Sequence, residues 1–247
     1  MVENYNIYRF TFRERLKVIL EGLLQTAILG YMFYKSLWGI IILSPLCYLH
    51  FLKKRNDLID KRKWQLNIEF RDGINSLSAA LNAGYSAEHA FMEAVKDLKK
   101  MYPKGSMIIN EFAYIANQIK MNITVEKALS DFANRCGIDD IISFAEVFAT
   151  AKRAGGEITQ IIKFTGNIIS DKVEIKREIM TLIAAKKFEA TIMKYVPVGI
   201  LFYLSCFSPD LLKPLYHNLF GIIIMTILLG IYLFTYRLID KIVSIEV

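Results

Sequence analysis

The chain has 247 residues, 54% hydrophobic and 22% charged, and it carries a formal net charge of +7. This much apolar surface excludes intrinsic disorder, 13 glycines and 5 prolines exclude a collagen-like chain, and three scattered cysteines exclude a disulfide scaffold. A membrane protein with one folded polar part remains, and its positive charge is open to three interpretations: nucleic-acid binding, an anionic surface or membrane orientation.

Two apolar segments lie near the N-terminus, at 18–34 and 37–52. We interpret residues 1–52 as an N-terminal membrane hairpin that turns at Lys35–Ser36. The first segment contains Glu21 and Gln25, so the alternative is that it lies at the membrane interface and only three spans exist. The second apolar run follows almost at once, with no small-residue cleavage site between them, which argues against a cleaved signal peptide.

Residues 53–189 are the predicted cytoplasmic domain, in which apolar residues recur at intervals of three and four, as in amphipathic helices. No stretch alternates polar and apolar residues for long enough to form a strand. We therefore expect a six-helix bundle made of three helical hairpins. Caps and breakers place its helices near 64–83, 86–101, 106–120, 124–136, 139–154 and 157–189.

Three junctions between these helices look alike. Each follows a helix with residues that tolerate a left-handed backbone: Gly84, Asn122 and the pair Gly155–Gly156. We interpret these residues as structural turns.

Helix-capping residues follow two of the turns. Ser86 and Thr124 are good N-caps, and Glu88 and Glu126 then fall in the first helical turn, where a negative charge complements the helix dipole.

The last helix of the domain is unusually long, because no proline occurs between Gly156 and Pro197. Its 33 residues from 157 to 189 would run about 50 Å. It either continues directly into the next membrane span or breaks near Lys186–Lys187 at the lipid headgroups.

Two further apolar segments, 190–207 and 219–236, form the predicted C-terminal membrane hairpin within 190–247. The second carries no charge over 18 positions. The first contains only Lys194, near its start, where a long side chain can reach the headgroups.

The distribution of Lys and Arg predicts the orientation, since basic residues favour the cytoplasmic side. The run 53–63 alone has six basic and two acidic residues, and the rest of the segment up to 189 balances at 16 of each. Both termini and the central domain are therefore predicted to be cytoplasmic in a multi-pass membrane protein. The balanced domain argues against a nucleic-acid partner.

Common catalytic and metal-binding patterns are not found in the sequence. It lacks the phosphate-loop pattern G-x-x-x-x-G-K-[ST] and the metal-binding spacings H-E-x-x-H and C-x-x-C. We expect no enzymatic activity and no cofactor or metal, and we interpret the three cysteines as small apolar residues.

Several motifs resemble the type II secretion F-domain family. The segments LSAALNAGYSAEHAF (77–91) and FATAKRAGGEI (148–158) are similar to the two glycine-containing turns of that domain. AKKFEA (185–190), YVP (195–197), SPDLLKPLY (208–216) and Gly221 are similar to TadB-type proteins of Tad (Flp) pili. Only one F domain is present, whereas general secretion and type IV pilus platform proteins of the family carry two, which favours a TadB/TadC-like member.

The resemblance implies a non-catalytic inner-membrane platform protein of a secretion or pilus assembly machine. Its expected partners are a hexameric secretion ATPase, pilin or pseudopilin subunits, and a second copy or a paralogous platform subunit. The candidate ATPase contacts are charges near the hairpin tips, for which solvated helix-end charges are the alternative interpretation: Glu88, Glu126, Lys152, Arg153 and Glu157. Two other functions are a non-catalytic transporter or channel subunit and a membrane-bound enzyme.

Overall fold

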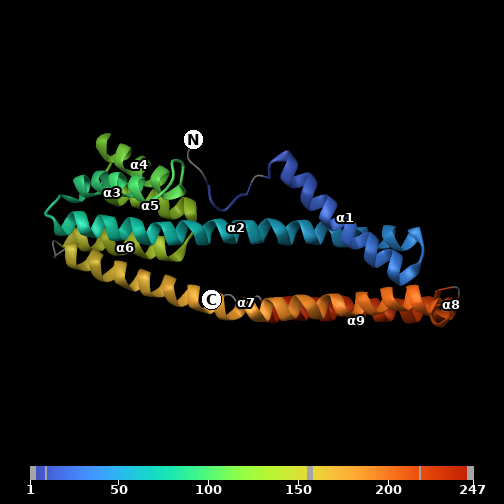
Figure 1. Ribbon diagram of the computed structural model, residues 1–247. Coiled ribbons are helices and arrows are strands. Elements are labelled where there is room, and N and C mark those ends of the chain that lie inside the picture. The colour runs from blue at the N-terminus through green and yellow to red at the C-terminus, as the bar shows by residue number, and fades with distance from the viewer. Residues whose placement is uncertain (1–3, 9, 155–157, 217, 244–247) are drawn as a thin grey trace. The chain divides into compact units, whose positions relative to one another are not determined.

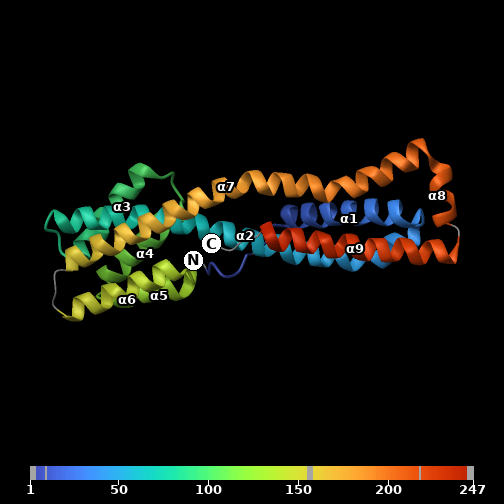
Figure 2. The ribbon, with the colours of Figure 1, turned by 90° about the horizontal axis from the view of Figure 1, so that it is seen from below.

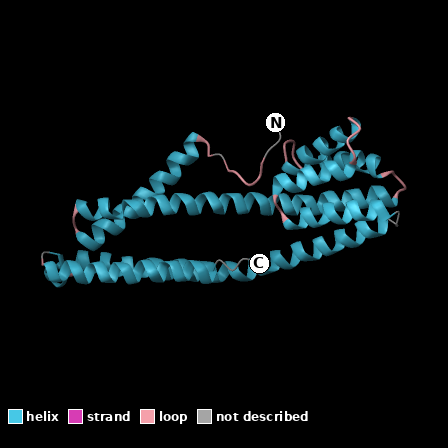
Figure 3. Cartoon of the chain, turned by 180° about the vertical axis from the view of Figure 1, so that it is seen from behind, coloured by secondary structure: helices cyan, strands magenta, loops and turns pink. Residues whose placement is uncertain are grey.

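The computed structural model describes residues 4–8, 10–154, 158–216 and 218–243, and within these ranges every regular element is an α-helix (Figure 3). The predicted all-α class is therefore confirmed. The helices are α1 (Phe12–Tyr34), α2 (Leu37–Asn82), α3 (Ala87–Met101), α4 (Met107–Lys120), α5 (Val125–Cys136), α6 (Asp139–Ala154), α7 (Ile158–Phe207), α8 (Pro209–Tyr216) and α9 (Leu219–Val243).

The chain forms two compact units. The first, here called the polar unit, comprises Met1–Arg9 and Asn56–Ile175. The second, here called the membrane unit, comprises Phe10–Arg55 and Lys176–Val247. The predicted boundaries at 52 and 189 differ from these divisions, because residues 4–8 belong to the polar unit and α2 and α7 each contribute to both units.

The core of the polar unit is built around large buried aromatic side chains. Phe70 of α2 lies 6.0 Å from Phe132 and 5.5 Å from Phe144 between ring centroids, the latter in an edge-to-face arrangement. Such pairs add about 0.5–1.5 kcal/mol beyond the burial of their surface. α3 packs against α4, α4 against α5 and α5 against α6, and Figure 1 shows these helices gathered beside the end of α2.

The shorter helices begin and end within one or two residues of their predicted limits, but the two long helices differ. The predicted helix 64–83 is the end of α2, which starts at Leu37. The predicted helix near 157–189 is the first part of α7, which passes through Lys186–Lys187 and Pro197 without a break. A charged run does not stop a helix when its residues have good helix propensity, so the change from apolar to basic sequence marks no boundary.

The membrane unit gathers four apolar helical segments around a small core. Buried side chains come from α1 (Phe33), α2 (Leu43) and α9 (Met225 and Leu229), and Leu201 of α7 packs against them. Figure 2 shows α1, α9 and the first part of α2 lying side by side.

Three helices among the described residues are long and apolar enough to cross a membrane: α1, the apolar part of α7, and α9 over Phe220–Ile242. Only 6% of the apolar window of α7 and 11% of that of α9 are buried within the protein. Long helices that expose apolar side chains on most of their surface are typical of membrane spans. The fourth predicted span, 37–52, forms the start of α2, where the side chains of four residues are not described, and it stays a prediction.

A short helix, α8, joins α7 to α9 and was not predicted. Pro209 is its first residue, a position where the missing N–H of proline costs nothing. The start of α9 lies so close to α8 that a Cβ on Gly221 would sit 2.5 Å from the carbonyl oxygen of Leu215. Glycine is therefore required at 221 for steric reasons.

Candidate functional site

Three of the predicted contact residues meet in the polar unit, and we call them the Lys152 cluster: Glu88, Glu126 and Lys152. The Nζ of Lys152 lies 3.2 Å from an oxygen of Glu126 and 3.6 Å from an oxygen of Glu88. Glu88 and Glu126 occupy the first turns of α3 and α5, and Lys152 occupies the last turn of α6. Each charge thus complements the dipole of its own helix while it pairs with a charge from another helix.

The turns that precede α3 and α5 place the two carboxylates. Gly84 has φ +87° and Asn122 has φ +63°, the left-handed conformation expected of residues that end a helix. A Cβ on Gly84 would meet nothing within 4 Å, so glycine suits this position because of its backbone angle and not because of crowding. The Oγ of Ser86 then accepts a hydrogen bond from the N–H of His89 at 3.4 Å, which caps α3.

The electrostatics of the cluster favour ionised carboxylates. Hydrogen bonding to backbone N–H at the start of α3, together with Lys152, lowers the pKa of Glu88. Burial opposes ionisation of Glu126, but its backbone hydrogen bond and Lys152 outweigh that effect and lower its pKa. All three side chains remain partly exposed. Partly exposed ion pairs stabilise a fold only weakly, so the cluster offers more as a charged surface than as a source of stability.

The remaining predicted contact residues do not join the cluster. Arg153 is exposed, and its Nε donates to the carbonyl oxygen of Ala149 at 3.1 Å on the same helix. Glu157 and the predicted turn Gly155–Gly156 lie outside the described residues.

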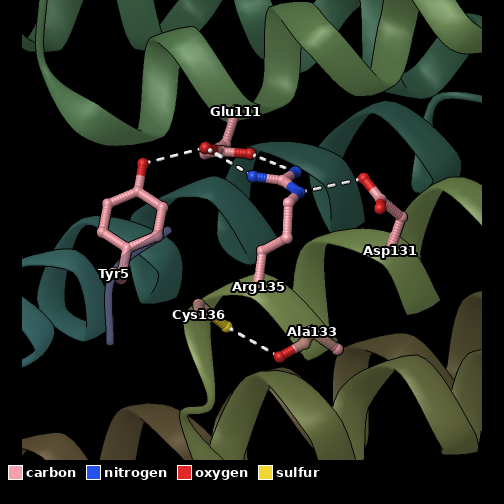
Figure 4. A network of polar contacts seen from close by, with 6 residues as sticks. All are labelled: Tyr5, Glu111, Asp131, Ala133, Arg135 and Cys136. Carbon is pink, nitrogen blue, oxygen red and sulfur yellow. Dashed lines mark hydrogen bonds and ion pairs between the residues drawn. The ribbon is translucent and has the colours of Figure 1, made fainter. Parts of the chain in front are cut away.

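A second polar network, not predicted from the sequence, ties the N-terminal segment to α4 and α5 (Figure 4). Glu111 is 4% exposed and accepts two hydrogen bonds from the guanidinium of Arg135, at 3.0 and 2.7 Å. Arg135 also donates from Nε to Asp131 at 3.0 Å, and the hydroxyl of Tyr5 donates to Glu111 at 2.8 Å. Burial alone would lower the pKa of Arg135, but its bonds to Glu111 and Asp131 raise it, so the guanidinium stays charged.

A third network joins α2, α6 and α7 in the same unit. The Nδ2 of Asn67 donates to Asp140 at 2.8 Å, and Lys172 donates to the other oxygen of Asp140 at 2.5 Å. Asp140 is 9% exposed, so both partners are needed to satisfy its carboxylate. This network fixes the start of α7 to the polar unit.

The described residues include no group of three His, Cys, Asp or Glu side chains that could hold a metal ion. Cys136 is buried, and burial raises the pKa of its thiol, which keeps it in the unreactive protonated form.

No family model matches the chain, and comparisons with curated proteins and with solved structures find no match either. The similarity to the F domain and to TadB-type proteins therefore rests on the sequence motifs alone.

Proposed function

We propose that the protein is a non-catalytic platform subunit of a type II secretion or Tad (Flp) pilus assembly machine in the inner membrane. In this role a cytoplasmic polar unit, formed as a six-helix bundle of three hairpins, couples a hexameric secretion ATPase to the movement of pilin or pseudopilin subunits. The motifs at 77–91, 148–158 and 185–216 support the assignment to this family.

One observation carries the mechanical part of the proposal: α7 is a single helix of 50 residues. Its first part contributes Ile162, Ile169 and Val173 to the core of the polar unit. Its last part is apolar and largely uncovered, as a membrane span is. A helix fixed at one end by buried side chains moves with the unit that holds it, so a displacement of the polar unit by the ATPase is passed along α7 to the membrane.

The Lys152 cluster and Arg153 form the proposed contact with the ATPase. The cluster combines the starts of two helices and the end of a third, so a partner that pairs with it touches three helices at once. A force applied there acts on α3, α5 and α6 together. A cluster shared by three helices therefore transmits force from the ATPase to the polar unit better than a single charge on one helix would.

A second copy of the chain, or a paralogous subunit, is the other proposed partner. α7 exposes large apolar side chains on the side opposite its core face: Phe164, Ile168, Ile175 and Leu182. Their spacings of four, seven and seven residues place them on one stripe of the helix. An exposed apolar stripe of this kind is typical of a helix that packs against another helix.

The test is capture of the partner ATPase by the detergent-solubilised full chain. We expect binding to the wild-type chain and at least tenfold weaker binding to a variant that carries Arg153→Glu and Lys152→Gln. The matched control, Lys99→Glu with Lys104→Gln, makes the same change of charge at exposed residues elsewhere in the polar unit and should bind normally. Absence of binding to the wild-type chain at every salt concentration would refute the proposal.

A further inference from the structure

We propose that the membrane unit has a binding site for an anionic phospholipid, with one acyl chain in a groove along α7 and α9 and the phosphate beside Lys53 and Lys194. The proposal depends on the membrane unit alone and is independent of the platform function.

The groove has a volume of about 310 Å³ and is mostly apolar. Its lining includes Phe33 of α1, Met193 and Leu201 of α7, and Met225, Leu228 and Ile231 of α9. This volume is far too small for a transmembrane helix, which is 10–12 Å wide with its side chains. It suits a narrow, flexible hydrocarbon chain.

The length of the groove agrees with this occupant. On α9 its lining extends from Met225 to Ile239, which is about 21 Å at 1.5 Å per residue. One leaflet of a bilayer core is about 15 Å thick, half of the full 30 Å. An acyl chain that enters at the headgroup level can therefore lie along the groove over its whole depth in the leaflet.

One end of the groove carries a cluster of three charges. Asp240 of α9 forms ion pairs with Lys194 of α7 and with Lys53 of α2. The Nζ of Lys194 also lies 4.5 Å from the centre of the Tyr236 ring, and its side chain is only 13% exposed. Two ammonium groups face one carboxylate, so the cluster has one positive charge that is not neutralised within it.

An anionic phosphate at this position completes the charge balance. Lys53 is half-exposed and has three N–H donors, so it can bind a phosphate oxygen while it keeps its bond to Asp240. Partly desolvated charges at the membrane surface are costly unless they are balanced. Lysines next to a membrane attract anionic lipids, and Arg55, two residues after Lys53, adds a further positive charge. A zwitterionic lipid fills the groove equally well but leaves the excess charge unbalanced.

The test is a lipid titration of the detergent-purified full chain, followed by native mass spectrometry and by thermal unfolding. Phosphatidylglycerol should bind more tightly than phosphatidylcholine with the same acyl chains, by about fivefold for each lysine engaged. Lys53→Gln should reduce this preference about fivefold. Lys213→Gln removes the same charge from α8, far along the sequence from the cluster, and should leave the preference unchanged. Inorganic phosphate alone should not raise the unfolding temperature, because it lacks the acyl chain.

A second variant tests the groove separately from the charges. Thr235→Trp places a large side chain in the lining and should weaken binding of both lipids while their ratio stays near the wild-type value. Equal affinity for the two lipids, or an unchanged preference in Lys53→Gln, overturns the proposal. An unchanged affinity in Thr235→Trp overturns the position of the acyl chain. No ATPase or pilin is present in these experiments, so their outcome is independent of the platform function.

Discussion

Tyr5 binds the buried carboxylate of Glu111 from a segment that precedes the first helix. Replacing Tyr5 by Phe removes one hydrogen bond to an ionised group while Arg135 still pairs with the carboxylate. We expect the free energy of unfolding to fall by about 1.5–3 kcal/mol, the range for hydrogen bonds to charged groups. Chemical denaturation of the detergent-purified chain measures this change. Tyr85→Phe, at a half-exposed tyrosine of the same unit, should have no effect. An equal loss in both variants contradicts the assignment.

The lowered pKa values of Glu88 and Glu126 predict a dependence of stability on pH. Both carboxylates are more acidic in the folded chain than their ordinary value of 4.5. Their contribution to stability is therefore complete above about pH 4.5 and is lost as the pH falls through the lowered values. In Lys152→Met both pKa values should rise, so the stability difference between wild type and variant should shrink on acidification. Thermal unfolding of both proteins from pH 7 to pH 3 measures this stability difference. A difference that stays constant over this pH range would contradict the prediction.

Local signals in the sequence identified the turns but could not identify the networks. Gly84 and Asn122 were found because a left-handed helix end favours particular residue types. Lys152 meets Glu126, which is 26 residues away, and only the packing of α5 on α6 brings them together. Glu111 did leave a signal, since it falls on the same helical face as the buried residues Ile108 and Ile115. A charge on an apolar face predicts a buried partner, but the sequence does not say which one.

Among the elements, α7 combines two apolar faces in its first part. One face lies in the core of the polar unit, and the other is the exposed stripe Phe164, Ile168, Ile175 and Leu182. At 100° per residue, Asp171 and Glu178 lie along one edge of the stripe and Lys172 and Lys176 along the other. Two copies in one membrane have parallel α7 helices. A two-fold axis between them brings the two stripes face to face.

This geometry predicts disulfide formation between copies. In a chain whose three cysteines are replaced by Ser, Ile168→Cys and Ile175→Cys should each give a covalent dimer on mild oxidation in membranes. A disulfide needs Cα atoms within about 7 Å, which only a facing position allows. Lys163→Cys and Arg177→Cys lie on another side of α7, are equally exposed to solvent, and should remain monomeric. Equal yields at all four positions, or dimers at the control positions alone, contradict pairing through the stripe.

The limits of a helix were predictable where a cap or turn residue interrupts the helical spacing of apolar residues. They were not predictable elsewhere. α3 to α6 are each bounded by such residues, for example Ser86 before α3 and Gly137 after α5. α2 changes from apolar to polar sequence in mid-helix and α7 changes from polar to apolar, and backbone hydrogen bonding is indifferent to such a change. Pro197 also fails to end α7, since prolines are tolerated inside membrane helices where the freed backbone group finds another partner.

At the scale of the whole chain, the position of Tyr5 restricts the membrane topology. Tyr5 is 2% exposed in the polar unit, so we expect residues 4–8 and the segment from Asn56 onward to lie on the same side of the membrane. The chain between them must then cross an even number of times. Either both 18–34 and 37–52 span, or neither does. The three-span alternative, in which only 37–52 of this pair crosses, would put Tyr5 on the wrong side to reach Glu111.

This parity predicts a labelling pattern for single cysteines placed in the cysteine-free chain. In right-side-out vesicles an impermeant maleimide should label Ser36→Cys and Asp210→Cys, which lie in the predicted external turns. Ile7→Cys, at a 58% exposed position beside Tyr5, and Lys99→Cys in the polar unit should be labelled only after permeabilisation. Labelling of Ile7→Cys from outside would require an odd number of crossings and would contradict the docking of Tyr5. Protection of both Ile7→Cys and Ser36→Cys would mean that neither N-terminal segment spans, because both positions would then lie on the same side as the polar unit.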